Sequence, residues 1–221
     1  MKFFLDTANL TEIEWAVNAG LIDGITTNPT LLARDAGETD PNDLLQQICG
    51  LVSGPISAEV ISVDAEGMYE EGRKLARIAD NIVIKIPMIE EGMQAVHRLK
   101  AEGIGVNVTL CFSSVQCLIA AKAGATFVSP FVGRLDDIGH DGMDVIRETR
   151  LIFDNYAIET ELLAASVRHP RHVAEAAMLG ADVATIPTST LKQLLLHPLT
   201  DRGLDQFLND WSKLVSRTKE A

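Results

Sequence analysis

The sequence predicts an α/β protein: a single-domain (β/α)8 TIM barrel with an additional C-terminal helix. Three observations favour this fold. Short β-branched runs alternate with helical patterns along the whole chain, as in proteins built on a parallel sheet. The connections are short, and no linker or low-complexity stretch divides residues 1–221. Polar residues gather at the carboxyl ends of the strand-like runs, where barrel enzymes keep their active sites.

Eight runs are typical of buried strands, because they are short and rich in aliphatic and β-branched residues. Eight strands that are each followed by a helix fit a closed parallel barrel better than an open doubly wound sheet. The runs lie near residues 2–8, 24–28, 56–61, 82–87, 105–110, 127–132, 159–166 and 182–187.

Apolar residues recur at helical spacing between these strands, most clearly over residues 10–19, 65–79 and 88–100. Glycine closes several of the helical patterns, as expected at a helix C-terminus. These glycines are Gly20, Gly103, Gly124 and Gly180.

Residues 200–218 form a further helical pattern after the eighth unit. Phe207, Leu208, Trp211 and Leu214 make this segment too apolar for a solvated tail. We expect it either to fold back over its own barrel or to dock on a neighbouring subunit.

The composition excludes several classes of protein. Of the 221 residues, 47% are hydrophobic and 23% are charged, as in ordinary globular proteins. The net charge of −12 leaves no basic footprint for nucleic acid. Cys49, Cys111 and Cys117 lack the spacing of a zinc site or a disulfide framework, which favours a reducing compartment. Without a signal-peptide core or an apolar stretch of membrane length, we expect a cytoplasmic protein with no membrane partner.

Polar residues interrupt the strand-like runs near their carboxyl ends, although parallel strands covered on both faces should be almost continuously apolar. Several lie two positions apart and so share a strand face, for example Thr26 with Asn28. The set comprises Asp6, Thr26, Thr27, Asn28, Glu59, Lys85, Asn107, Thr109, Ser129, Ser166 and Arg168.

Lys85 is the sharpest of these signals, since it lies inside the run IVIKIP with isoleucines on the opposite strand face. Burial disfavours the ammonium form of a lysine, and a neutral amine is a nucleophile that forms a Schiff base with a ketone or aldehyde. The alternative is a structural lysine paired with Asp6 or Glu59.

Asp6 and Glu59 are the natural acid–base pair for such an amine. Carbinolamine formation and carbon–carbon cleavage both move protons, which requires a carboxylate near the imine or one acting through water. For Asp6 the alternative is a cap for the helix that begins near residue 10.

Arg134 and Arg168 follow the sixth and seventh strands. Two guanidinium groups fixed at the barrel mouth bind a phosphate by bidentate hydrogen bonds, and an acidic protein needs such a local cationic patch to hold an anionic sugar. The alternative for Arg134 is a surface ion pair with Asp136 or Asp137. His169-x-x-His172 lacks a further ligand at metal spacing, so we expect no metal there.

Seven short motifs lie in register along the chain: LDTAN at 5–9, GITTNPTL at 24–31, SAEV at 57–60, VIKIP at 83–87, VNVTL at 106–110, SPFVGR at 129–134 and AASVR at 164–168. Together they resemble the transaldolase family, most closely the small transaldolases and their sister family, the fructose-6-phosphate aldolases. The resemblance runs from Met1 to about Trp211 and implies a (β/α)8 barrel.

The resemblance also implies a reaction, in which a dihydroxyacetone unit passes from sedoheptulose 7-phosphate to glyceraldehyde 3-phosphate within the pentose phosphate pathway. Lys85 would be the Schiff-base lysine and Asp6 the acid–base group that takes the C4 hydroxyl proton. Glu59 with Thr109 would hold the catalytic water. No metal or organic cofactor is implied, because the protonated imine stabilises the carbanion.

The remaining matched positions would bind the substrate. Asn28 and Asn107 would contact hydroxyls of the dihydroxyacetone unit, helped by Ser129. The two arginines and Ser166 would bind the phosphate.

Two positions separate the sister families. Transaldolases resemble one another in having Glu and Phe where the aldolases have Gln and Tyr, and this sequence has Glu59 and Phe131. A carboxylate relays protons through water, which Gln does not. Without a tyrosine hydroxyl near the imine, the enamine should survive until an aldehyde acceptor arrives, which favours transfer over release.

Two other functions stay open. The nearest is an aldolase that releases free dihydroxyacetone, and a more distant one is a barrel that binds sugar phosphate without turnover. Relatives in the small-transaldolase group form pentameric rings, often stacked as decamers, with the C-terminal helix reaching a neighbour. The resemblance therefore implies a homo-oligomer.

Overall fold

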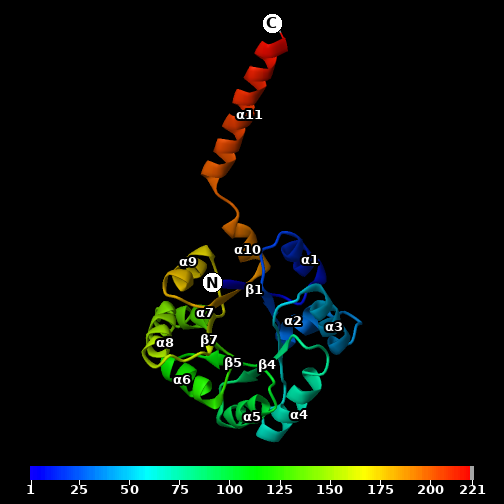
Figure 1. Cartoon of the computed structure of the whole chain (residues 1–221), viewed down its shortest axis with the longest axis vertical. Coiled ribbons are helices and arrows are strands. Elements are labelled where there is room, and N and C mark those ends of the chain that lie inside the picture. The colour runs from blue at the N-terminus through cyan, green and yellow to red at the C-terminus, as the bar shows by residue number, and fades with distance from the viewer. Residues whose placement is uncertain (220–221) are drawn as a thin grey trace.

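Eight parallel strands pair in chain order, and β8 returns to β1, so the sheet closes into the predicted barrel (Figure 1). The computed structural model describes residues 1–219, and residues 220 and 221 of the predicted domain lie outside the described part. The strands are β1 (Lys2–Asp6), β2 (Gly24–Thr26), β3 (Ile56–Glu59), β4 (Ile82–Pro87), β5 (Val106–Cys111), β6 (Phe127–Pro130), β7 (Glu161–Ala164) and β8 (Val183–Ile186).

All eight predicted strands are present, and several end two residues earlier than predicted. The reason is that the polar residues at their ends already belong to the loops above the barrel. Asn28, for example, caps the helix after β2: its side chain accepts a hydrogen bond from the Leu31 N–H at 2.9 Å. Pro29 then takes the first helical position, where no donor is needed.

All of the helices except α11 lie around the barrel (Figure 1). The helices are α1 (Leu10–Asn18), α2 (Pro29–Asp35), α3 (Pro41–Leu51), α4 (Ala65–Leu75), α5 (Glu90–Ala101), α6 (Ser114–Ala123), α7 (Val132–Asp136), α8 (Met143–Tyr156), α9 (Pro170–Met178), α10 (Thr188–Leu194) and α11 (Pro198–Lys219). The glycines predicted to end helices have positive φ, as at Gly124 (105°) after α6.

Two cores fill the fold. The outer core lies between the strands and the helices and includes Ile82, Ile84 and Ile86 of β4. Val83, between these isoleucines, belongs instead to the inner core, because alternate residues of a strand face opposite sides. The inner core fills the barrel interior with Phe4, Val83, Phe127, Leu163, Ala165 and Val183.

The inner core depends on a position without a side chain. The rings of Phe4 and Phe127 meet edge to face with centroids 5.8 Å apart. A Cβ at Gly24, on the neighbouring strand, would lie 2.7 Å from the Phe4 ring. Gly24 therefore makes room for the aromatic pair that closes the barrel from below.

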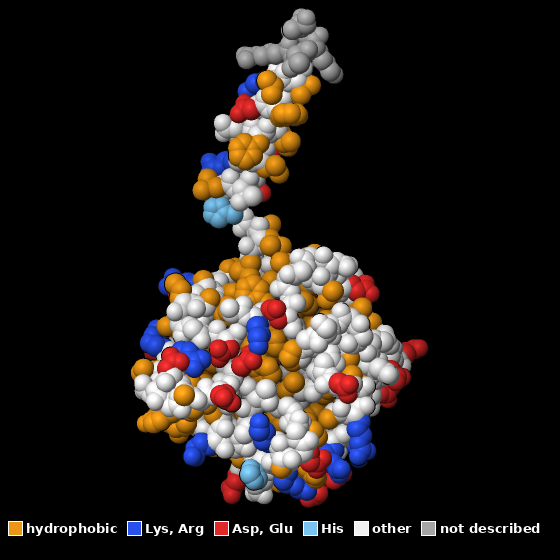
Figure 2. Space-filling model, viewed as in Figure 1, with side chains coloured by type: hydrophobic (Ala, Val, Ile, Leu, Met, Phe, Trp, Pro, Cys, Tyr) orange, Lys and Arg blue, Asp and Glu red, His pale blue; other side chains and the backbone are white. Residues whose placement is uncertain are grey.

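The C-terminal helix α11 leaves the barrel after α10 and extends away from it (Figure 1). Phe207 and Trp211 are 73% and 65% exposed, and Figure 2 shows apolar side chains along the projecting helix. Within one chain, the segment therefore does not fold back over its own barrel. No helix in residues 1–219 is long and apolar enough to cross a lipid bilayer.

Candidate active site

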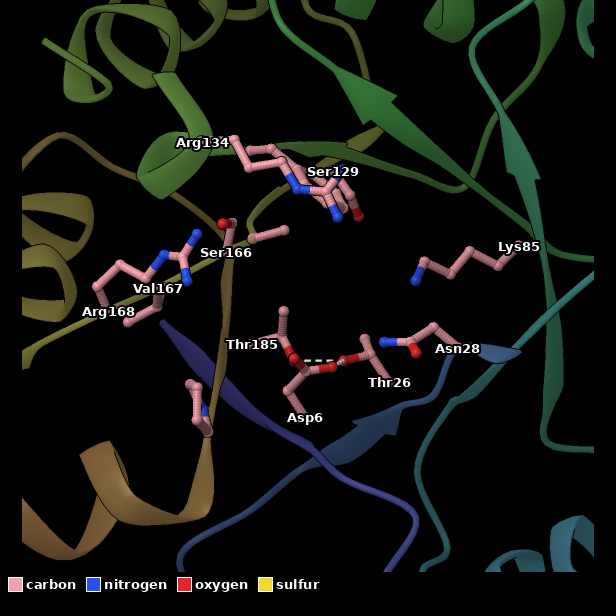
Figure 3. Close-up of a pocket in the computed structure, with 13 residues that line it drawn as sticks. Asp6, Thr26, Asn28, Lys85, Ser129, Arg134, Ser166, Val167, Arg168 and Thr185 are labelled. Carbon is pink, nitrogen blue, oxygen red and sulfur yellow. Dashed lines mark hydrogen bonds between the residues drawn. The ribbon is translucent and has the colours of Figure 1, made fainter. Parts of the chain in front are cut away.

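Two residues beyond the inner core, the inward strand faces become polar. Because side chains two apart share a face, Asp6, Lys85, Ser129 and Thr185 follow Phe4, Val83, Phe127 and Val183 into the barrel. All four line one cavity at the carboxyl ends of the strands (Figure 3). The full lining is Asp6, Thr26, Asn28, Lys85, Ser129, Phe131, Arg134, Ala165, Ser166, Val167, Arg168, Thr185 and Pro187.

Lys85 is 6% exposed, and its amine reaches the cavity wall. Its Nζ lies 2.9 Å from Glu59 Oε2 and donates to the Thr27 carbonyl at 3.1 Å. Glu59 and Lys85 are register neighbours on β3 and β4. The sequence alternative of a structural pairing with Glu59 is thus realised, but the pair stands at the cavity rather than at an outer surface. A buried amine next to a carboxylate has a proton acceptor within hydrogen-bond distance.

Asp6 approaches the cavity from β1. Its Oδ1 accepts a hydrogen bond from the Thr26 hydroxyl at 2.8 Å, and Thr26 Oγ1 lies 2.5 Å from Thr185 Oγ1 (Figure 3). Burial raises the pKa of Asp6, while the Thr26 hydrogen bond and the charges of Lys85 and Arg34 lower it. The alternative of a helix cap does not apply, since Asn9 caps α1.

The sequence did not predict Thr185 as a site residue, and it indicated Thr26 only as a polar residue at a strand end. Since Thr26 donates its hydrogen to Asp6, Thr185 must be the donor in the second hydrogen bond. The two hydroxyls therefore form a short chain that ends on the carboxylate. Strand alternation could have identified Thr185, because it lies two residues after Val183, which faces the barrel interior, and therefore shares its strand face.

Asn107 and Thr109 are not among the residues that line the cavity. Asn107 is fully buried: its Oδ1 accepts from Ser129 Oγ at 2.6 Å, and its Nδ2 donates to Ser57 Oγ at 3.1 Å. This amide orients Ser129, which does line the cavity. In the described part of the chain, the buried Thr109 hydroxyl has no hydrogen-bond partner.

Arg134 and Phe131 form one side of the cavity. The Arg134 guanidinium lies over the Phe131 ring, 4.8 Å from its centroid. Asp136 and Asp137 are not its ion-pair partners, since Asp136 contacts His172 and Asp137 contacts Arg168. The alternative of a surface ion pair at Arg134 is therefore wrong, and its charge faces the cavity.

Arg168 and Ser166 complete the same end of the cavity. Arg168 Nη2 donates to Asp137 Oδ2 at 2.9 Å, and Ser166 has a left-handed backbone with φ of 60°, a conformation that costs about 1–3 kcal/mol and gathers at functional sites. A Cβ at Gly133 would lie 2.2 Å from the Ser166 carbonyl oxygen and 2.6 Å from Arg168 Nε. Glycine is therefore required where α7 approaches the loop after β7.

The charges are arranged across the cavity. In Figure 3, Lys85 and Arg168 come from opposite sides, with Asp6 and Arg134 on the two remaining sides. A chain with a net charge of −12 thus concentrates three cationic side chains around one hollow. The geometry suits an elongated molecule with a reactive group at the lysine and an anionic group at the arginines.

The structure brings together most of the predicted site. Three predicted residues, Glu59, Asn107 and Thr109, are absent from the lining. Glu59 and Asn107 contact lining residues, namely Lys85 and Ser129. Among the residues described here, no group of three or more His, Cys, Asp or Glu side chains is placed to hold a metal ion.

The fold is a (β/α)8 barrel with a polar cavity at the carboxyl ends of its strands, the face at which barrel enzymes keep their active sites. The family model described as Transaldolase/Fructose-6-phosphate aldolase matches residues 3–218. The chain therefore belongs to the transaldolase/fructose-6-phosphate aldolase family.

Several relatives named "Probable transaldolase" are similar over almost their entire length. One from Hydrogenobaculum sp. (strain Y04AAS1) is 57% identical, with 98% of this chain and 99% of the relative covered. One from Desulfatibacillum aliphaticivorans is 59% identical, with 96% and 99% covered. One from Methanococcus maripaludis is 55% identical, with 98% and 100% covered.

Proposed function

We propose that the protein is a transaldolase that transfers a dihydroxyacetone unit between sugar phosphates through a Schiff base on Lys85. The observation that carries the proposal is the buried Lys85 amine at the cavity wall, 2.9 Å from the Glu59 carboxylate and across the cavity from Arg168. A barrel that only binds sugar phosphate, the more distant alternative, has no need of a nucleophilic amine at this position.

In the proposed reaction, the neutral Lys85 amine attacks the C2 carbonyl of fructose 6-phosphate or sedoheptulose 7-phosphate. The carbinolamine loses water to give an iminium ion. Asp6 then takes the C4 hydroxyl proton as the C3–C4 bond breaks, and the electron pair moves into the iminium. The aldose phosphate leaves, and the enamine on Lys85 adds to a second aldose phosphate by the reverse steps.

The proton transfers have candidates within the site. Glu59 contacts the amine directly, and the orphaned Thr109 hydroxyl is the kind of buried group that a bound water satisfies. Glu59 and Thr109 are proposed to hold the catalytic water. Asn28, Ser129 and, behind it, Asn107 are proposed to hold the hydroxyls of the dihydroxyacetone unit.

Phosphate recognition is assigned to Arg134, Ser166 and Arg168. Arg134 has no carboxylate partner in the described chain, and Arg168 holds only the exposed Asp137, so both guanidinium groups have donors for a phosphate. Sugar phosphates of the pentose phosphate pathway are the proposed substrates, and the cytoplasm is the proposed location.

Transfer is favoured over release because Phe131 lines the cavity without a hydroxyl that could protonate the enamine. Product analysis with fructose 6-phosphate tests this proposal. We expect sedoheptulose 7-phosphate only when erythrose 4-phosphate is present, and little free dihydroxyacetone without it. Dihydroxyacetone formed without any acceptor would identify an aldolase and contradict the role of Phe131.

We also propose that α11 docks on a second copy of the chain, giving a homo-oligomer, either a pentamer or a decamer. Its exposed apolar side chains recur at helical spacing, including Leu204, Phe207, Leu208 and Trp211. The double substitution Phe207→Glu and Trp211→Glu should lower the mass in solution, whereas the matched change at the solvent-facing Asp205→Asn should not. An unchanged mass would contradict this use of α11.

A further inference from the structure

We propose that His172 is a positioning residue that locks the two phosphate-binding arginines into one unit. The proposal rests on the phosphate role given above to Arg134 and Arg168. His172 itself does not line the cavity. It lies on α9, buried at 5% exposure, and connects the loop that carries Arg168 with the helix that carries Arg134.

The His172 ring makes one hydrogen bond to each side. Its Nδ1 accepts from the Arg168 backbone N–H at 3.3 Å, and its Nε2 lies 2.9 Å from Asp136 Oδ2, at the end of α7. Asp136 is anchored in turn, because its Oδ1 accepts from the Gly142 N–H at 2.8 Å. The chain of contacts thus runs from the Arg168 backbone through one imidazole to the helix of Arg134.

The arrangement requires a single tautomer. The Asp136 carboxylate only accepts hydrogen bonds, so it keeps the imidazole proton on Nε2 and leaves Nδ1 free to accept from Arg168. A protonated ring would present a hydrogen at Nδ1 to the Arg168 N–H, and this contact would be lost. Asp136 therefore sets both the orientation and the protonated nitrogen of His172.

The surroundings of His172 favour the neutral ring that this bridge needs. Burial lowers the pKa of His172 and the charge of His169 lowers it further, whereas Asp136 and Glu175 raise it. His169 caps α9 and places its ring 3.8 Å from the His172 ring, centroid to centroid. Arg168 is also charged, but it contacts the His172 ring through its backbone N–H.

The close packing of α7 against the loop after β7 makes the positions of the two arginines sensitive to small backbone shifts. Gly133 of α7 donates its N–H to the Ser166 carbonyl at 3.1 Å, so the helix and the loop already touch without space for a Cβ. A shift of the Arg168 backbone would move its guanidinium relative to Arg134. Bidentate phosphate binding depends on that relative placement.

The His172→Gln variant tests the proposal, because Gln retains a donor for Asp136 but has no acceptor at the Nδ1 position. We expect inorganic sulfate, measured as a competitive inhibitor against fructose 6-phosphate, to bind about tenfold more weakly. The KM for glyceraldehyde 3-phosphate should rise similarly, with kcat changed much less. The His172→Asn variant, which keeps an acceptor near Nδ1, should recover most of the affinity.

Two controls separate this inference from the function on which it rests. His97→Leu, on the exposed face of α5, should leave the sulfate affinity unchanged. Borohydride trapping of dihydroxyacetone on Lys85 needs no phosphate, and should persist in the folded His172→Gln protein. Failure of the unmodified protein to trap dihydroxyacetone would overturn the proposed function, and with it this role.

The proposal is overturned if folded His172→Gln binds sulfate as the unmodified protein does while trapping succeeds in both. It is also overturned if His172→Asn and His172→Gln lose affinity equally and in step with a lowered Tm, since that pattern indicates a structural role only. Asp136→Asn, which frees the imidazole to change tautomer, should weaken sulfate binding like His172→Gln.

Discussion

The barrel interior has two layers on the same strand faces: the apolar inner core, called here the lower layer, and the polar cavity at the carboxyl ends of the strands, called here the upper layer. In the lower layer, Phe4 and Val83 are fully or almost fully buried among apolar neighbours. Two residues further on, Asp6 and Lys85 occupy the same faces, where burial of their charged forms costs free energy. The comparison teaches that the lower layer contributes stability, which offsets the cost of the reactive groups above it.

Lys85→Ala is the change with the largest expected effect in the upper layer. Turnover should fall by at least about 10⁴-fold, because among the described residues no other lysine lines the cavity to form the covalent intermediate. The borohydride-trapped adduct, measured as a mass increase, should vanish. Lys74→Ala, on the exposed face of α4, is the matched control and should retain both. An adduct that persists in Lys85→Ala would contradict the assignment.

Asp6→Asn should separate activity from stability. We expect kcat to fall by about 10²- to 10⁴-fold, as for loss of a general base. The pKa of Asp6 is raised in the folded protein, so the protonated carboxyl stabilises the fold. This contribution is present at pH values below the ordinary pKa of aspartate and is lost as the pH rises through the raised pKa. At neutral pH the ionised carboxylate therefore destabilises the fold, and the variant should have a higher Tm. A lowered Tm would contradict this account.

Phe4→Leu, in the lower layer, should lower stability while leaving the reactive lysine in place. The smaller side chain leaves a void beside Phe127 and removes the edge-to-face contact, so the free energy of unfolding should fall by about 1–3 kcal/mol. Dihydroxyacetone trapping should continue in the folded protein. Chemical denaturation measures the first quantity, and loss of trapping without loss of stability would show that the two layers are not separable.

Thr26→Val has the smallest expected effect, and it addresses the boundary between the layers. The Thr26 hydroxyl lowers the pKa of Asp6, so its removal should raise that pKa further. The acid limb of the kcat/KM profile should move to higher pH. Thr26→Ser keeps the hydroxyl and should leave the limb in place; a shift in both variants would point to packing instead.

Much of this two-layer arrangement follows from strand parity, which is visible in the sequence. The run IVIKIP predicted that Lys85 and the three isoleucines lie on opposite strand faces, and the position of the isoleucines in the outer core confirms it. Thr185 escaped notice because a β-branched residue in a strand is ordinary. Its role depends on the closure of β8 against β1, which brings it next to Thr26.

Other features depend on partners that no local pattern specifies. The ion pair of Asp137 with Arg168, rather than with the nearby Arg134, follows from how α7 is oriented against the loop after β7. The direction of α11 is a similar case. The sequence predicted a helix too apolar for a solvated tail, but not whether its apolar side chains would lie on its own barrel.

The hydrogen bond between Thr26 and Thr185 spans 159 positions of the chain. Closing the ring therefore joins segments that lie far apart in the sequence, and such non-local pairing forms slowly. Until the final strand docks, the Asp6 carboxylate lacks its complete set of hydroxyl neighbours. Carbon–carbon cleavage is the step in which Asp6 is proposed to act, so its recovery during refolding should report when the ring has closed.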